Sequence, residues 1–171
     1  MIELKWRQSL IGFFMATAHL IHGYLGAGKT TFARRLEEQL PAIRFSHDEW
    51  MANFYGDDPP MNQFAEFHQR VSKLIDTYWK RCVTLGLDVV LDFGFWSRRQ
   101  RDETRATALA LGARTRLYLL ECPEDEAWRR IDKRNAHLDG SLLIVRNTFE
   151  MLKSRFEPLA DDEDRTEVRQ C

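Results

Sequence analysis

The most informative stretch of the chain is the glycine-rich sequence GYLGAGKTT. It fits the Walker A pattern, in which two glycines five positions apart are followed by lysine and threonine. Glycines let backbone N–H groups converge on phosphate oxygens, and the positive end of the following helix faces the same anion. The loop is therefore predicted to bind ATP through Gly23, Tyr24, Leu25, Gly26, Ala27, Gly28, Lys29, Thr30 and Thr31.

Three side chains of this region are predicted to handle the triphosphate and its metal ion. Lys29 is expected to reach the β- and γ-phosphates as a catalytic group, and the Thr30 hydroxyl to bind Mg²⁺. Asp92 ends the apolar run VVLD, which is the Walker B pattern for an acid that holds Mg²⁺. Asp92 is also placed next to the substrate. The alternative for Asp92 is a strand-end aspartate that caps a turn.

A second carboxylate, Asp48, lies in the sequence FSHDEW at the expected end of the second strand. Phosphoryl transfer to an alcohol needs a group that accepts the hydroxyl proton and positions the oxygen for attack. Asp48 is predicted to be that catalytic, substrate-binding acid. His47 and Glu49 are rivals, and capping of the next helix is the structural alternative for Asp48.

Two groups of arginines could stabilise the charge on a moving phosphoryl group. Arg130 and Arg134 are four positions apart, so they share one helix face beside a break at 135–141, and they are predicted to form a catalytic, ATP-contacting lid. Arg98 and Arg101 follow the third strand and are predicted to bind substrate, with Trp96 in the acceptor pocket. Solvated arginines, and an aromatic ring that seals the sheet edge, are the alternatives.

Strand and helix patterns alternate along the chain, which is typical of a parallel sheet covered on both faces. The expected fold is an α/β P-loop NTPase or kinase fold of four to five strands with an arginine-bearing lid. Polar side chains of such folds gather beyond the carboxyl ends of the strands. Strands are expected at 17–22, 42–46, 87–92, 115–121 and, at the edge, 166–168; helices are expected at 29–40, 62–85, 98–111, 123–134 and from Ser141 to Phe156.

Length and charge restrict the classes of protein. The 171 residues suit one domain, divided here into an N-terminal extension (1–14), a kinase domain (15–164, with a lid at 135–141) and a tail (165–171). The net charge of −1 gives no general attraction to nucleic acid. No apolar run is long enough to span a bilayer, and a signal peptide near residue 18 would remove most of the first strand. A cytoplasmic monomer or homodimer is expected.

Four segments together resemble the small bacterial AAA-domain kinases, which are related to chloramphenicol phosphotransferase, the zeta toxins, gluconate kinase and polynucleotide kinase. The segments are HGYLGAGKTTFARRL, FSHDEWM, DVVLDFGFWSRRQRD and CPEDEAWRRIDKRN. The resemblance covers about residues 16–164. It implies a P-loop kinase sheet, and it assigns the same roles to the glycine loop, Asp48, Asp92 and the two arginine groups. The absence of a clearly apolar fifth strand is a departure from the pattern.

The leading interpretation is a phosphotransferase that moves the γ-phosphate of Mg-ATP to a hydroxyl of a small molecule such as a sugar, nucleoside or antibiotic. A polynucleotide 5′-hydroxyl kinase and a zeta-toxin-like nucleotide-sugar kinase are alternatives, and the first needs a basic groove for the strand. A nucleotide-binding switch or ATPase without an acceptor is the remaining class.

Overall fold

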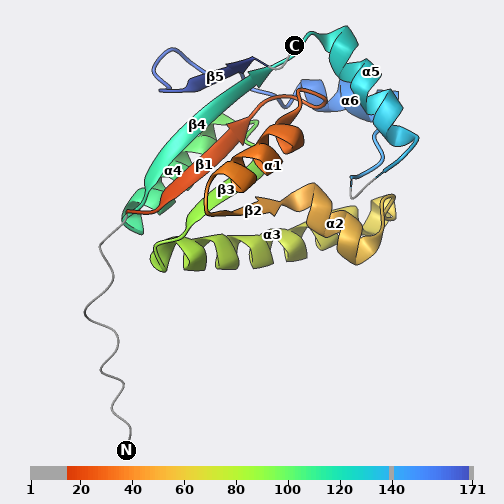
Figure 1. Ribbon diagram of the computed structural model, residues 1–171. Helices are drawn as coiled ribbons and strands as arrows, with labels where there is room; N and C mark the ends of the chain where they lie inside the picture. Colours follow the sequence, from red (N-terminus) through yellow and green to blue (C-terminus); the bar gives the residue numbers. More distant parts are fainter. Residues whose placement is uncertain (1–14, 139–140, 170–171) are drawn as a thin grey trace, which may run out of the picture.

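In the computed structural model, the chain forms a five-stranded, all-parallel sheet with helices on both faces (Figure 1). The structure describes residues 15–138 and 141–169. The sheet has the order β2-β3-β1-β4-β5. Its strands are β1 (Thr17–His22), β2 (Ala42–Ser46), β3 (Asp88–Gly94), β4 (Arg114–Glu121) and β5 (Thr166–Arg169). The helices are α1 (Lys29–Gln39), α2 (His47–Tyr55), α3 (Met61–Thr84), α4 (Arg98–Ala110), α5 (Glu124–Asn135) and α6 (Arg146–Lys153).

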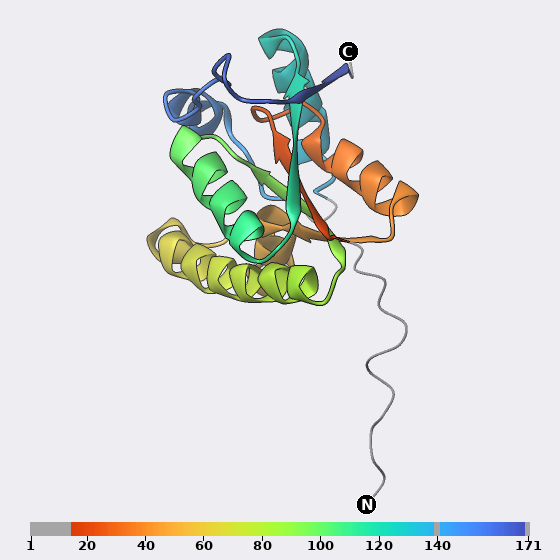
Figure 2. The ribbon, with the colours of Figure 1, turned by 90° about the vertical axis from the view of Figure 1, so that its left-hand side faces the viewer.

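Two apolar layers hold the helices against the sheet. On one face, α3 and α4 cover the strands through a core that includes Ile75, Trp79 and Ala108 (Figure 2). On the other face, α1 packs Ala33 and Leu36 on β1, β3 and β4. The central strands are buried on both sides, which explains why they read as apolar runs.

Two serines start helices directly after strands and so place side chains at the carboxyl edge of the sheet. The Ser46 hydroxyl accepts a hydrogen bond from the backbone N–H of Glu49 at 3.4 Å and begins α2. Ser97 does the same for Gln100 at 3.2 Å and begins α4. Both are N-caps, which satisfy N–H groups that have no partner within the helix. The first turn of α2 and the turn before α4 therefore lie at the edge of the sheet that also carries the glycine loop.

The predicted fold class is confirmed, and two local expectations need correction. Asp48 does not end a strand, because β2 ends at Ser46, which also caps the helix that begins at His47. The last helix is shorter than predicted and begins after Val145, with Ser141 outside it. The edge strand expected at 166–168 does form; it pairs in parallel with β4 from Tyr118↔Thr166 to Glu121↔Arg169. Residues 1–14 and 170–171 lie outside the described residues, as do 139 and 140 within the expected lid. Within the described part, none of the helices is long and apolar enough to cross a bilayer.

Candidate active site

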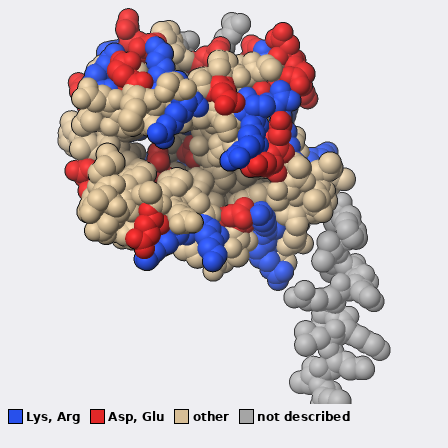
Figure 3. All heavy atoms as spheres, turned by 180° about the vertical axis from the view of Figure 1, so that it is seen from behind, with Lys and Arg blue, Asp and Glu red and all other residues tan. Residues whose placement is uncertain are grey.

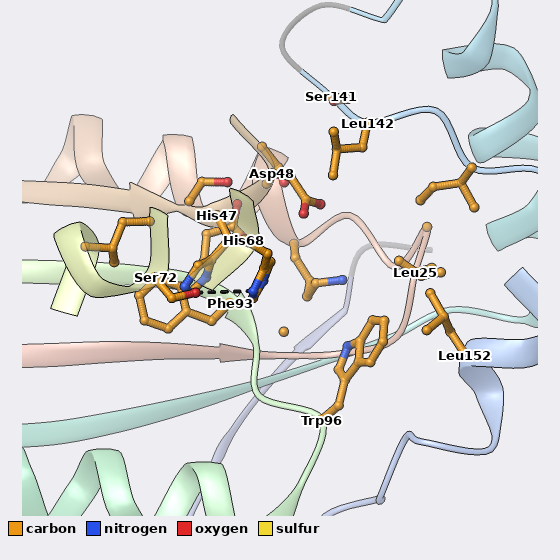
Figure 4. Close-up of a pocket in the computed structure, with 18 of the residues that line it drawn as sticks. Leu25, His47, Asp48, His68, Ser72, Phe93, Trp96, Ser141, Leu142 and Leu152 are labelled. Atoms are coloured by element: carbon orange, nitrogen blue, oxygen red, sulfur yellow. Dashed lines mark hydrogen bonds between the residues drawn. The ribbon is translucent and has the colours of Figure 1, made fainter. Parts of the chain in front are cut away.

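A cavity of about 2070 Å³ lies at the carboxyl edge of the sheet. It is bounded by the glycine loop, the first turn of α2, the end of β3 and the second half of α5 (Figure 4). Most of the predicted site residues line it together: Leu25, Gly26, Gly28, Lys29, Thr30, Thr31, Asp48, Asp92, Trp96, Arg130 and Arg134. Side chains that are up to 109 positions apart in the chain (Leu25 and Arg134) therefore meet at one place.

The glycine loop takes a shape that only glycine fits at two positions. Gly28 has φ 88° and immediately precedes α1, so the loop leads directly into the N-terminus of that helix. Gly26 has φ 76°, and a Cβ there would lie 2.4 Å from the Ala127 carbonyl oxygen of α5. The loop thus lies against the helix that carries Arg130 and Arg134. This close packing brings phosphate-binding backbone and arginine side chains to the same wall.

Lys29 lies at the centre of the charged groups of the cavity. Its Nζ donates a hydrogen bond to the Tyr24 carbonyl at 2.8 Å, within the same loop. Burial lowers the pKa of Lys29 from its ordinary value, and the charges of Asp92 and Asp48 oppose that shift. The Lys29 ammonium, the candidate metal ligand and the candidate base are therefore close enough to influence one another.

Asp92 is a buried carboxylate at the end of β3, beside Thr30 of the glycine loop. Burial raises the pKa of Asp92, and Lys29 and the Thr30 hydroxyl counteract the rise. Its Oδ2 makes no hydrogen bond within the described residues, and Arg44 Nη1 lies 4.0 Å from it. A buried, unsatisfied carboxylate oxygen next to a threonine hydroxyl suits Mg²⁺, which takes few protein ligands and completes its shell with phosphate and water. Among the described residues there is no cluster of three or more acidic, histidine or cysteine ligands that would suit another metal.

Asp48 lies in the first turn of α2, and its side chain extends into the cavity opposite Leu25 and Trp96 (Figure 4). The cap of that helix is Ser46, so capping does not account for Asp48. Its neighbour Glu49 turns away and forms an ion pair with Arg44. Of the three rival groups in the sequence HDE, Asp48 and His47 therefore line the cavity.

The cavity wall next to Asp48 consists of aromatic rings whose contact was not predicted from the sequence. His47 stacks on His68 of α3 with ring centres 5.2 Å apart, and it meets the edge of Phe93 at 4.3 Å (Figure 4). His68 Nδ1 and the Ser72 hydroxyl are hydrogen-bonded at 3.3 Å. Burial and the neighbouring His68 lower the pKa of His47 to about 4, so this ring is neutral near pH 7. The two histidines are 21 positions apart and belong to different helices, so no local pattern pairs them.

The two arginines of α5 that line the cavity, Arg130 and Arg134, differ in how many of their nitrogens make hydrogen bonds. Arg134 has its Nε and Nη2 buried, and neither makes a hydrogen bond within the described residues. Burial lowers the pKa of Arg134, and the charge of Asp48 opposes the shift, which places the guanidinium across from that carboxylate. Arg130 also lines the cavity and donates from Nε to Glu126 at 2.7 Å. Arg134 is therefore the cation best placed to receive an external anion.

Arg98 and Arg101 have different partners from those predicted. Neither lines the cavity. Arg101 is fully buried and donates to both carboxylate oxygens of Glu163, at 2.7 and 2.8 Å. Arg98 donates to both oxygens of Asp162 at 2.9 Å, and the Glu157 carboxylate accepts from its backbone N–H at the start of α4. The anions that offset these cations come from the chain's own segment after α6, so in this structure both arginines have partners within the chain and lie outside the cavity in which substrate contact was predicted.

The turn between β3 and α4 supports the glycine loop from below. Trp96 Nε1 donates to the Gly23 carbonyl at 3.2 Å, so this ring holds the loop as well as lining the cavity. Phe95 has a positive φ of 48°, and its carbonyl receives Arg101 Nη1 at 2.9 Å and contacts His22 Nδ1 at 3.0 Å. Burial lowers the pKa of His22 to about 4. A positive φ at a non-glycine residue persists only where such contacts hold it.

The sequence profile of a family described as an AAA domain matches residues 19–159. The chain belongs to this AAA domain family. The match spans every element from β1 to α6, and it confirms the resemblance stated from the sequence motifs. No curated protein matches the chain.

Solved structures resemble this AAA domain in fold at low identity. A chain of the Pnkp1/Rnl/Hen1 RNA repair complex is 19% identical, with a TM-score of 0.66 over 82% of this chain and 44% of that one. Kti12 of Chaetomium thermophilum, in complex with ADP-AlF3, is 17% identical, with a TM-score of 0.61 over 86% and 90%. A gluconokinase from Sinorhizobium meliloti 1021 is 13% identical, with a TM-score of 0.58 over 91% and 82%. The AAA domain thus spans less than half of the RNA repair chain. These similarities establish a shared fold.

Proposed function

We propose that this AAA domain transfers the γ-phosphate of Mg-ATP to a hydroxyl group of a small molecule. The observation that carries the proposal is the meeting of Lys29, Asp92, Asp48 and Arg134 in one cavity at the carboxyl edge of the sheet. A nucleotide binder needs the loop and the metal ligand, whereas a second carboxylate opposite the phosphate suits an acceptor. Asp48 therefore favours a transferase over a switch or an ATPase.

Each cavity residue has its own role in the proposed phosphoryl transfer. Backbone N–H groups of the glycine loop and Lys29 bind the β- and γ-phosphates, and Arg134 offsets charge on the moving group. Asp92 and Thr30 would hold Mg²⁺, which when bound neutralises phosphate charge and orients the triphosphate. Asp48 accepts the proton of the acceptor hydroxyl. The acceptor oxygen forms its bond to the γ-phosphorus while the bond from that phosphorus to the β–γ bridging oxygen breaks, and ADP leaves.

The charges on the acceptor side favour a small molecule over a nucleic acid. The charged cavity residues contributed by α3 and α4 are Asp76, Lys80 and Glu103. Lys80 is bonded to Asp76 at 2.6 Å. The loop before α3 adds two further acids, Asp57 and Asp58. A polynucleotide needs cations along its path, and this wall supplies more carboxylates than ammonium groups.

Labelled ATP tests the proposal. The protein is incubated with γ-labelled ATP and a library of alcohols, and label is followed into organic product and inorganic phosphate. The expected result is acceptor-dependent label in an organic product, with no ATP-dependent activity in Lys29→Ala. Hydrolysis at the same rate with and without every alcohol would instead support an ATPase.

A further inference from the structure

The cavity does not end at the ring wall beside Asp48 but continues between α3 and α4. From α3, one stripe of side chains borders it from Phe64 through His68 to Trp79. From α4, the facing residues are Gln100, Thr104 and Thr107. Figure 3 looks onto this side of the molecule, where the surface is hollowed. We call the space between these two rows of side chains the α3–α4 groove.

The α3–α4 groove is longer than a single sugar ring. His68 and Trp79 are eleven positions apart on one helix, which corresponds to about 16 Å at 1.5 Å per residue. The whole cavity of about 2070 Å³ also exceeds the roughly 300–1,000 Å³ of common ligand sites. A nucleotide at the glycine loop and a monosaccharide at Asp48 would leave the far part of the groove unfilled.

The two sides of the groove differ in chemistry. The α3 side presents the rings of Phe64 and His68 and then the Ser72 hydroxyl, whereas Ile75 and Trp79 also border it but are only 1% and 3% exposed. The α4 side carries hydroxyl and amide groups, from Thr104, Thr107 and Gln100. Further along α3, Asp76 accepts hydrogen bonds from Trp79 Nε1 at 3.2 Å and from Lys80 Nζ at 2.6 Å. Glu103 of α4 adds a second carboxylate, which pairs with Arg99 at 3.6 Å.

We propose that the acceptor is an elongated alcohol of two or more rings, uncharged or amine-bearing, that lies along the α3–α4 groove with one hydroxyl at Asp48. One face of its rings packs against Phe64 and His68 of α3, and its polar groups bond to the α4 side. Among the described charged side chains that border the groove, the two carboxylates of Asp76 and Glu103 outnumber the one ammonium group of Lys80, which suits an amine and opposes a phosphate. This inference rests on the proposed function, because it assigns the second substrate of the same reaction.

The test compares acceptors of different length and charge with γ-labelled ATP. The single-ring set is glucose and glucosamine, with open-chain gluconate as a short anionic acceptor. The multi-ring set is maltotriose, kanamycin and erythromycin, and a trinucleotide with a free 5′-hydroxyl serves as an elongated polyanion. Label is expected in at least one multi-ring alcohol, at a rate at least tenfold above every single-ring compound. Label confined to single rings, or entering the trinucleotide, would overturn the inference while leaving phosphotransfer intact.

Variants on one helix show whether the groove holds the acceptor. Thr104→Trp places a large ring in the groove from the α4 side, and we expect at least a tenfold loss of transfer to the multi-ring acceptor. Leu109→Trp adds the same ring to an exposed position of α4 that does not line the cavity, and transfer should stay within twofold. Thr107→Trp is a second groove variant if Thr104→Trp does not fold.

The affinity for Mg-ADP, measured by calorimetry, should be unchanged in all three variants. Unaltered transfer by both folded groove variants would contradict this location for the acceptor. Failure to label any compound, with Mg-ADP binding intact, would count against the proposed function itself and remove this inference with it.

Discussion

The arginines at the start of α4 and those at the end of α5 lie in opposite electrostatic surroundings. Arg101 has a full set of internal acceptors, including both oxygens of Glu163 and the Phe95 carbonyl. Arg134 is also largely withdrawn from solvent, yet two of its nitrogens have no acceptor within the described residues. A buried cation without an internal anion is costly unless a ligand supplies one. The difference supports the proposal that Arg134 binds phosphate, and it shows that Arg101 is bound within the fold.

Among the arginine variants, the largest expected effect comes from Arg134→Met. We expect ATP-dependent turnover to fall by about 10³-fold, because arginines that offset charge in phosphoryl transfer contribute at that scale. The melting temperature should hold or rise, since the substitution removes a buried charge without breaking a hydrogen bond. Arg129→Met is the matched control, because Arg129 is exposed, pairs with Glu126 and does not line the cavity. Turnover within twofold of wild type for Arg134→Met would contradict the comparison.

The converse change is Arg101→Met, which should act on stability. We expect the free energy of unfolding in urea to fall by about 3–5 kcal/mol, because Glu163 is left as a buried charge. The double variant Arg101→Met/Glu163→Leu should recover most of that loss. Turnover per folded molecule should remain close to wild type. If Arg101→Met were as stable as the wild type but had no turnover, Arg101 would have to take part in the reaction.

The turn that Arg101 holds also contacts His22 of β1, whose protonation tests the same network. His22 has a pKa of about 4 in the folded state against 6.5 in the unfolded chain, so the unfolded chain binds more protons between these values. Stability from His22 is therefore fully present above about pH 6.5 and lost as pH falls toward 4, by about 3 kcal/mol in all. His22→Gln should remove that part of the acid sensitivity in unfolding measured from pH 7 to 4. Equal pH profiles for the wild type and His22→Gln would show that burial does not lower the pKa of His22.

The smallest effect is expected for Arg98→Ala. Arg98 forms bidentate hydrogen bonds with Asp162 at 2.9 Å, but both groups are open to solvent, which weakens such pairs. We expect a shift of melting temperature clearly below that of Arg101→Met and no change in turnover. A shift as large as that of Arg101→Met would mean that the two ion pairs act as one unit.

The sequence predicted those parts of the site that local chemistry determines. The glycine loop, Lys29, Thr30 and Asp92 follow from spacing and from the end of a buried strand, and they line the cavity or support it as expected. The partners of Arg101 could not be predicted, because Glu163 is 62 positions away and lies in a polar tail that resembled a loose end. The stacking of His47 on His68 could not be predicted either, since it depends on how α2 packs on α3.

Most of the fold could also be predicted from the sequence, but one edge strand and one helix could not be assigned with the same clarity. Alternating apolar runs indicated four of the five strands, and the fifth was only an edge possibility because TEVR has one apolar residue. Its pairing comes from the exposed edge of β4, which no local pattern reports. The helix at 47–55 was missed because its signal, the Ser46 cap, follows a strand without an intervening loop.

Transfer by Asp48→Asn tests the central claim most directly. The variant keeps the shape of the side chain but cannot accept the acceptor proton, so label transfer from γ-labelled ATP should fall by about 10²–10⁴-fold. Calorimetric affinity for Mg-ADP should stay within about threefold, because the glycine loop and Asp92 are untouched. Wild-type transfer by Asp48→Asn would contradict the assignment of this carboxylate as the base.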